Sequence, residues 1–599
     1  MTRKCALMLV PLLCAAMLAA GSAPAAEDLL GVMPEKTLGF ATINGLAKVD
    51  GKLVRLGERM QLPASSPLAK LKETIGIEKG LDEKGRAAIV VMPGEDADSD
   101  PIVLLFAPVT NFKQFVGQLE AEDAKDGLVK VDVNGAEFLV GNKGGYAVFA
   151  EPKHRDVLVA GLASSNKVAG ELATWSQWLA SNDATIVITR SGVELLCSKL
   201  SEEIKNVQTS FEQMPEEMRG QLGPAVAVFD VYRKMFDMGG REVQAYGAAV
   251  QVDGKGNLLL TDRMRFTPNG AAAKAIAGVK PAESNWLAGL PASPFVIAGG
   301  GVLPESLMEA MMGFSMEMMK AMPEVYGVSE EQAAELGKLS VEYMKGLRSM
   351  SMVMGVGEPG TSLYESMAVI MKVDDAKKFM ANYEESIRKI SEMTKGDKPS
   401  MFSGMKVRKI KFGDADALEL SMKFPELPGM ENVPDFEKMA EAMFGPGGKL
   451  NAYIVPADDH TVVAAYVSKA NARKCLKLIQ EGKGGLAENK GVARTAALLP
   501  KGAQWIGYFS PAGTVQFINN FIPTIIPDGG NAFKLPEFSR TPPIGFAAKV
   551  ADGEVHGTMA VPAPVIKAVG EYVQEIQKMI IKQMMTPKPD LLDEEPEVF

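Results

Sequence analysis

The sequence predicts an α+β fold of two tandem duplicated units, each an antiparallel sheet covered on one face by helices. Three observations support this prediction. Short motifs recur in the same order in both halves of the chain, apolar residues alternate with a period of two around tight turns, and amphipathic helical stretches lie between these runs. With 599 residues the chain is also too long for one hydrophobic core, since single domains seldom exceed ~250–300 residues.

A turn followed by an apolar, β-rich run occurs four times. Residues 290–298 resemble residues 499–508, and further copies begin at Met33 and Leu179. Three more motif pairs follow in the same order along the two halves. These pairs are 109–115 with 373–379, 146–160 with 453–465, and 247–253 with 545–552. Their unequal spacing is typical of an old tandem duplication that has acquired loop insertions.

Local patterns predict three hairpins and several helices. Asn134-Gly135 and Gly413-Asp414 stand between alternating runs and supply the positive φ angles that tight turns need. Residues 251–260 are expected to form the third hairpin. Residues 375–393 and 470–480 are expected to form amphipathic helices. In the paired motifs at 109–115 and 373–379, an Asn or Asp is available as the helix N-cap.

The expected organisation is a leader at 1–26, a first unit at 27–284, a second unit at 285–585 and a disordered acidic tail at 586–599. A methionine-rich helical insertion is expected at about 303–350. The last helix, at 564–585, should dock on the second unit through one apolar side, which carries Ile566, Val569, Val573, Ile576, Ile580 and Met584.

The first 26 residues are typical of a secretory signal peptide. Arg3 and Lys4 precede an apolar stretch, and small residues end it, so cleavage is expected near Ala25 or Ala26. The apolar run is shorter than the ~20 residues that span a bilayer. A lipid anchor at Cys14 is disfavoured because Leu13 precedes it. The mature chain is therefore expected in the periplasm or outside the cell, without a transmembrane segment.

Charge and cysteine content exclude two further classes of protein. The formal net charge is −10, and loss of Arg3 and Lys4 leaves 62 basic against 74 acidic residues, or −12. A negative surface repels nucleic acid phosphates, so no nucleic acid partner is expected. Only Cys197 and Cys475 follow the leader, which excludes a disulfide-stapled fold. They either form one bridge or are two buried small side chains.

No motif in the sequence predicts catalysis, a metal or a cofactor. Residues 355–360 fit the spacing of a dinucleotide fingerprint, but a strand rather than a helix is expected to follow them. The acidic run at 96–100 lacks the glycine and the final glutamate of a calcium loop. His154, His460 and His556 are the only histidines and show no zinc-ligand spacing. We therefore expect no enzyme, no metal and no cofactor.

Methionine is the one unusual feature that remains. Six methionines recur at helical spacing after Pro304, and they are Met308, Met311, Met312, Met318, Met319 and Met322. Three interpretations are open: the buried face of a core helix, an adaptable apolar groove for a lipid or a partner, or a soft-metal site for Cu(I). The six residues are thus the candidate apolar binding face of the chain.

The repeated Leu-Pro-x-x-x-x-apolar strand and the Val-Asp-Asp-x-x-x-Phe helix start at 373–379 resemble an uncharacterised family of large secreted bacterial proteins, a domain of unknown function. This resemblance implies an exported globular protein and carries no catalytic residue. The leading hypothesis is an exported, non-enzymatic scaffold or binding protein. The alternatives are a periplasmic carrier of an apolar ligand that uses the methionine-rich helix, and a hydrolase with dispersed catalytic residues.

Overall fold

A computed structural model describes residues 26–63, 65–94, 96, 99–164, 167–282, 285–321, 329–394, 404–423, 436–525 and 534–585. The chain has a mixed architecture with 44% helix and 30% strand, and its strands form a large antiparallel sheet. The expected signal peptide and acidic tail lie outside the described residues.

Ten strands of the first half form one continuous antiparallel array. In spatial order from the outer edge they are β4, β5, β6, β7, β3, β2, β1, β8, β9 and β10. Their bounds are β1 (Gly39–Asn44), β2 (Arg86–Met92), β3 (Ile102–Pro108), β4 (Glu120–Asp123), β5 (Val129–Val133), β6 (Ala136–Lys143), β7 (Tyr146–Ala150), β8 (Ala184–Ile188), β9 (Val243–Val252) and β10 (Leu258–Phe266).

Ten strands of the second half follow the same spatial order. From the opposite edge they are β14, β15, β16, β17, β13, β12, β11, β18, β19 and β20. Their bounds are β11 (Phe295–Val302), β12 (Leu347–Gly355), β13 (Met367–Val373), β14 (Lys406–Phe412), β15 (Ala415–Lys423), β16 (Lys449–Asp458), β17 (Thr461–Tyr466), β18 (Trp505–Phe509), β19 (Ile544–Ala551) and β20 (Glu554–Val561).

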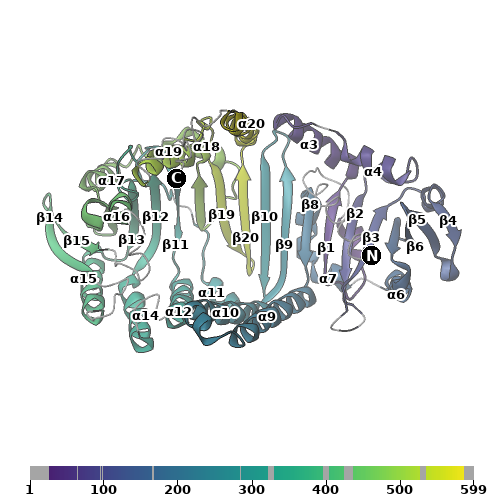
Figure 1. Cartoon of the computed structure of the whole chain (residues 1–599), viewed down its shortest axis with the longest axis horizontal. Helices are drawn as coiled ribbons and strands as arrows, with labels where there is room; N and C mark the ends of the chain where they lie inside the picture. The colour runs from purple at the N-terminus through teal and green to yellow at the C-terminus, as the bar shows by residue number, and fades with distance from the viewer. Residues whose placement is uncertain are drawn as a thin grey trace, which may run out of the picture.

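The two halves share one sheet rather than forming two, because β10 and β20 pair with each other. This antiparallel pairing runs from Leu258 opposite Val561 to Arg265 opposite Glu554, and we call it the seam. The expectation of a separate sheet in each unit therefore needs correction. A strand edge in either half would expose unpaired backbone groups, and pairing across the seam satisfies them. Figure 1 shows the resulting sheet across the width of the molecule, with β10 and β20 near its centre.

Helices gather at the two ends of the strands (Figure 1). The helices of the first half are α2 (Ala26–Val32), α3 (Leu46–Arg59), α4 (Pro67–Ile75), α5 (Phe112–Val116), α6 (Arg155–Ala163), α7 (Lys167–Glu171), α8 (Ser176–Ser181), α9 (Arg190–Glu212), α10 (Glu216–Glu242) and α11 (Ala271–Ala277). Those of the second half are α12 (Glu305–Ala321), α14 (Glu330–Met344), α15 (Ala376–Met393), α16 (Phe436–Phe444), α17 (Lys469–Glu481), α18 (Lys490–Ala496), α19 (Pro511–Ile525) and α20 (Ala563–Met585).

Each hairpin and helix cap that local pattern predicted is confirmed. Asn134 and Gly135 have φ angles of 55° and 80° between β5 and β6, and Gly413 has a φ of 64° between β14 and β15. The side chain of Asn111 accepts a hydrogen bond from the N–H of Gln114 at the start of α5. Asp375 does the same for Lys378 at the start of α15. These features depend only on neighbours in sequence, which is why sequence patterns reveal them.

One motif pair does not fall on equivalent positions. Tyr146 lies in β7, and the 3₁₀ turn that contains His154 leads into helix α6. Tyr453 instead lies in β16, and the turn at His460 leads into strand β17. By strand order β7 corresponds to β17, so this sequence match is wrong. The turn-and-strand motifs lead into β1, β8, β11 and β18, the pair 109–115 and 373–379 falls on the starts of α5 and α15 after β3 and β13, and the last pair falls on β9 and β19.

Both faces of the outer part of the sheet are covered, which corrects the expectation of helices on one face only. In β3, Leu104 and Phe106 belong to one buried cluster with residues of α2 and α6, whereas Leu105 and Ala107 contact a different cluster with Phe115 of α5. Successive side chains of a strand point to opposite faces, so the two clusters lie on opposite sides of β3.

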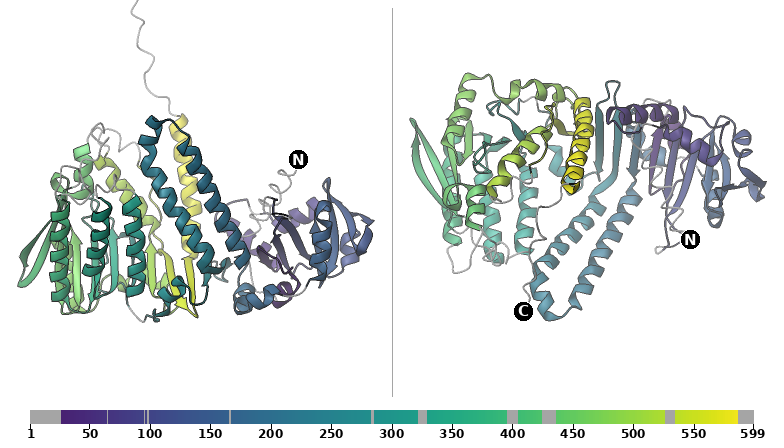
Figure 2. Two further views of the ribbon diagram at one scale, coloured as in Figure 1. Left: turned by 90° about the horizontal axis from the view of Figure 1, so that it is seen from below. Right: turned by 45° about the horizontal axis from the view of Figure 1, so that its top comes forward.

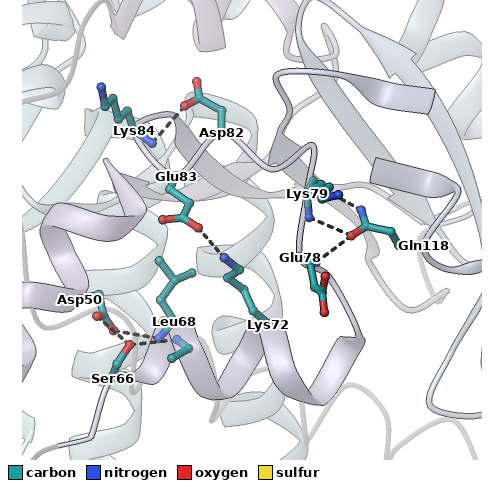
Figure 3. Close-up of polar contacts among 11 residues, drawn as sticks. Asp50, Ser66, Leu68, Lys72, Glu78, Lys79, Asp82, Glu83, Lys84 and Gln118 are labelled. Atoms are coloured by element: carbon teal, nitrogen blue, oxygen red, sulfur yellow. Dashed lines mark hydrogen bonds and ion pairs between the residues drawn. The ribbon is translucent and has the colours of Figure 1, made fainter. Parts of the chain in front are cut away.

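Polar contacts fix helices α3 and α4 to the first half (Figure 3). Asp50 of α3 accepts hydrogen bonds from the hydroxyl of Ser66 and the N–H of Leu68, both 2.8 Å long, at the start of α4. Lys72 of α4 pairs with Glu83 at 2.6 Å before β2. Asp50, Lys72 and Glu83 thus have partners within the fold, so we regard these contacts as structural.

Candidate functional site: the open face of the sheet

The central strands leave one face of the sheet open. A groove of about 490 Å³ lies on this face, across the seam, and takes its lining from β8, β9, β10, β19 and β20. Its side chains are mostly apolar, and the set used below is Ile186, Tyr246, Ala248, Val250, Leu260, Asp262, Phe546 and Met559. This volume lies in the range of small-molecule binding sites.

Strand register brings these side chains together from both halves. Ile186 lies opposite Ala248, Ala248 opposite Asp262, and Asp262 opposite Gly557. The neighbouring row runs from Val250 through Leu260 and Met559 to Phe546. Residues directly opposite each other in an antiparallel pair share a face, so the two rows form one surface. The groove therefore exists only because β10 pairs with β20.

Large apolar side chains on this face are exposed to solvent. Ile186 is 44% exposed and Phe546 is 40% exposed, and Ile297 in β11 reaches 45%. Val187, the next residue after Ile186, is fully buried on the opposite face. An exposed apolar patch on a folded protein commonly marks a surface that binds an apolar partner.

Several helices project from the sheet to the same side, among them the long α9–α10 hairpin and α20 (Figure 2, left). They also carry exposed apolar side chains, which are Leu196, Leu200, Val207, Tyr232, Met235, Met238, Val573, Ile580 and Ile581. Part of the contact between α9 and α10 is polar, since Ser201 donates a hydrogen bond to Asp237 at 2.8 Å and Gln208 donates one to Asp230 at 3.2 Å.

Asp262 is the one acidic side chain of the groove lining. An ideal Cβ placed on Gly557 would lie 2.1 Å from Asp262 Oδ2, so the carboxylate occupies the space that a side chain at 557 would fill. Burial raises the pKa of Asp262, while a hydrogen bond from the Gly557 N–H and the nearby His556 act in the opposite direction. Burial also raises the pKa of Tyr246, with a smaller contribution from Asp262.

The opposite face at the seam is closed and holds a buried ionic network. Glu554 accepts hydrogen bonds from Trp175 Nε1 at 2.9 Å and from Arg265 Nε at 2.7 Å, and lies 3.1 Å from His556 Nε2. Burial favours the neutral carboxyl, but the hydrogen bonds from His556, Trp175 and Arg265 outweigh it and lower the pKa of Glu554 to about 2. Trp178 donates to Thr261 beside this network.

The structure separates the methionines of the candidate binding face. Met308 and Met319 are each 8% exposed and belong to two different buried clusters, whereas Met311 is 55% exposed. Met312 and Met318 are half-buried, and Met322 lies outside the described residues. Because Met308 and Met319 are buried in two different clusters, the six methionines cannot all face one ligand. The contacts of Met308 and Met319 favour the core interpretation for those two residues.

The last helix also departs from expectation. Ile566 is buried, but Val569, Val573 and Ile580 are 36%, 46% and 45% exposed. The helix packs against the first half as well, since a Cβ on Gly570 would lie 2.6 Å from the carbonyl oxygen of Met60. The helix also contacts the second half, where the ring centroid of Tyr572 lies 5.1 Å from that of Phe538. The predicted docking on the second unit therefore describes only part of the contacts of α20, because this helix also lies next to α3.

The glycine motif at 355–360 and the two cysteines do not form a binding site in the structure. Residues 355–360 connect β12 to β13, so no helix follows the glycine motif. Cys197 and Cys475 are both free thiols, on α9 and α17, and burial raises the pKa of Cys475 to about 12. Within the described ranges, no group of three His, Cys, Asp or Glu side chains could hold a metal ion. No described helix is both long enough and apolar enough to cross a membrane.

Comparisons of the chain with protein-family models, with curated proteins and with solved structures find no match. The candidate site thus depends on geometry alone. Motif analysis missed it because its residues come from five strands of two halves. One signal was present: β10 carries Leu258, Leu260, Met264 and Phe266 at alternate positions, and Asp262 interrupts this apolar row.

Proposed function

We propose that this chain is an exported, non-enzymatic binding protein that holds an apolar ligand on the open face of its sheet. The observation that carries the proposal is the groove of about 490 Å³ across the seam, with Ile186 and Phe546 exposed in its lining. The proposal keeps the carrier hypothesis but moves its site from the methionine-rich helix to the sheet.

Burial energetics support a ligand at this position. Covering apolar surface contributes roughly 25 cal/mol for each Å² removed from water. A folded chain that leaves Ile186, Phe546 and Ile297 exposed on one face forgoes that contribution until a ligand covers them. Nothing in the groove resembles a nucleophile with a paired base, so binding rather than turnover is the function proposed.

Export is part of the proposal. Helix α2 begins at Ala26, next to the expected cleavage site, and Leu29, Leu30 and Met33 are buried in the first core. Cleavage near Ala25 or Ala26 would therefore leave these core residues in the mature chain. Amino-terminal sequencing of the protein purified from the periplasm should then begin near Glu27, and a start at Met1 would contradict export with cleavage.

We also infer that the two halves arose by tandem duplication. The identical spatial order of ten strands in each half supports this inference, as do the four matched turn-and-strand motifs at β1, β8, β11 and β18. The last strands of the two halves, β10 and β20, pair with each other, and the groove takes its lining from both halves. A single half would therefore lack this groove. The proposed site would thus be a product of the duplication.

A binding assay with an apolar fluorescent probe tests the function. The mature chain is expected to bind the probe with one site, and Phe546→Asp should weaken binding at least tenfold because it places a charge in the apolar lining. Leu62→Asp is the matched control, since Leu62 is 54% exposed and lies between α3 and α4, away from the groove lining.

The control should bind the probe as the unmodified chain does, and both variants should unfold at the same urea concentration as that chain. Equal loss of binding in both variants, or no binding by the unmodified chain, would contradict the proposed site. Mass spectrometry of the native protein after periplasmic purification adds an independent measurement, in which a stoichiometric co-purified lipid supports the proposal.

A further inference from the structure

We propose that the groove selects amphiphiles with a cationic head group, whose ammonium pairs with Asp262 while the chain covers the apolar lining. This inference rests on the proposed function, and it adds the chemical class of the ligand. It starts from a single feature, a carboxylate placed inside an otherwise apolar groove.

Asp262 has no counter-charge on its own face. Within the described chain no ion pair involves Asp262, and the basic residues of β10 occupy alternate positions on the opposite face. Arg263 lies over the ring of Trp178, and Arg265 pairs with Glu554 at 2.7 Å. A half-buried carboxylate without a cation is costly, and an ammonium group from a ligand would offset that cost.

The position of the carboxylate is fixed by the backbone opposite it. Asp262 lies directly across from Gly557 on β20, and the space above this glycine is filled by the carboxylate oxygen itself. A side chain at 557 would displace Asp262. The glycine thus leaves the carboxylate lying across the seam, in the same row as Ile186 and Ala248 and beside the apolar row of Val250, Leu260, Met559 and Phe546.

An aromatic ring beside this position adds affinity for a cation. Tyr246 on β9 lies opposite Met264, two residues after Asp262, so it is a diagonal neighbour of the carboxylate on the same face. The face of an aromatic ring attracts an ammonium group, more so where water is excluded. The neighbouring apolar row, with Leu260, Met559 and Phe546, offers surface to an alkyl chain.

Three probes of equal chain length test the charge preference on the mature full-length protein. Decylammonium, decanol and decanoate differ only in the head group. Calorimetry compares their affinities below the critical micelle concentrations of the two ionic probes and below the solubility limit of decanol. Decylammonium is expected to bind at least tenfold more tightly than decanol, and decanoate least tightly. This comparison uses only the unmodified protein, so it tests the proposal even if a substitution disturbs folding.

The variant Asp262→Asn then isolates the carboxylate. It should reduce the affinity for decylammonium at least tenfold and change that for decanol less than threefold. Asp552→Asn is the matched control, because Asp552 lies in the exposed β19–β20 turn with a φ of 53°, which asparagine tolerates. The control should bind all three probes as the unmodified protein does.

The outcomes separate this inference from the proposed function. If all three probes bind with equal affinity, or if Asp262→Asn leaves decylammonium binding unchanged, the head-group preference is wrong and the apolar site stands. Tightest binding of decanoate also overturns the preference. If none of the probes binds the unmodified protein, the proposed function itself fails.

Discussion

The two faces of the sheet at the seam have opposite chemistry. The closed face buries charge: Glu554, Arg265 and His556 form one network beneath Trp175. The open face exposes apolar side chains such as Ile186 and Phe546. Soluble antiparallel sheets usually show the reverse, with an apolar covered face and a polar solvated one. The closed face carries side-chain contacts between the two halves, such as those of Glu554 with Trp175 and Arg265, whereas the open face is the location of the proposed ligand site.

The largest expected effect comes from adjacent residues of β8. Val187 is fully buried on the closed face, and Ile186 is 44% exposed on the open face. Val187→Asp should destabilise the fold by about 4 kcal/mol or more, because it buries an unpaired charge. Ile186→Asp should lower the free energy of unfolding by less than about 1 kcal/mol, because the new carboxylate stays exposed to solvent. Urea unfolding followed by circular dichroism measures both, and equal costs would remove the distinction between the faces.

The ionic network on the closed face is the next test. Glu554→Gln removes the charge that Arg265 pairs with and should destabilise the fold by about 2–3 kcal/mol, because the largely buried guanidinium then has no counter-charge. Glu137→Gln is the matched control, since the Lys130–Glu137 pair is exposed to solvent and should contribute little to stability. A cost as small as that of the control would show that the network does not join the halves.

The carboxylate of Glu554 should also make the stability of the fold depend on pH. The folded pKa of Glu554, about 2, lies below the ordinary value of about 4.3, so the folded state holds fewer protons. Its stabilisation is therefore present above pH ~4.3 and is lost as the pH falls toward 2. Unfolding free energies measured between pH 5 and pH 2 should fall more steeply for the unmodified chain than for Glu554→Gln. Parallel curves would contradict this assignment.

Two helical glycines give the smallest effect. Gly570→Ala should destabilise by about 1–2 kcal/mol, because its Cβ meets the backbone of Met60 across the contact between α20 and α3. Gly313→Ala in α12 has nothing within 4 Å of the new Cβ and should stabilise by about 0.5–1 kcal/mol through helix propensity. Thermal unfolding measures both, and effects of the same sign would show that α20 does not pack tightly on the first half.

The comparison between halves shows what varies around a common sheet. The connection from β3 to β4 contains α5, with 5 residues, whereas the connection from β13 to β14 contains α15, with 18. Between β1 and β2 lie α3 and α4, and between β11 and β12 lie the methionine-rich α12 and then α14. Strand pairing constrains the sheet, while helices at the strand ends change length without altering the register.

The sequence by itself determined the local features of this chain. Alternating apolar residues around Asn134-Gly135 and Gly413-Asp414 predicted the hairpins, and Asn111 and Asp375 cap the helices at which they were expected. Each depends on residues a few positions apart, so no distant contact can remove the signal. Alternation also shows which residues share a face of a strand.

Only the tertiary structure decided what covers each face. In β8 the consecutive apolar residues Ile186 and Val187 have different environments: Val187 is buried and Ile186 lies on an open surface. Trp175 and Trp178 lie over one side of the strand, and no described helix lies over the other. The pairing of β10 with β20 joins residues about 300 positions apart, and Asp262 meets Gly557 only through that pairing. Contacts at such separation leave no local periodicity, so the seam and its groove could not be predicted from the chain alone.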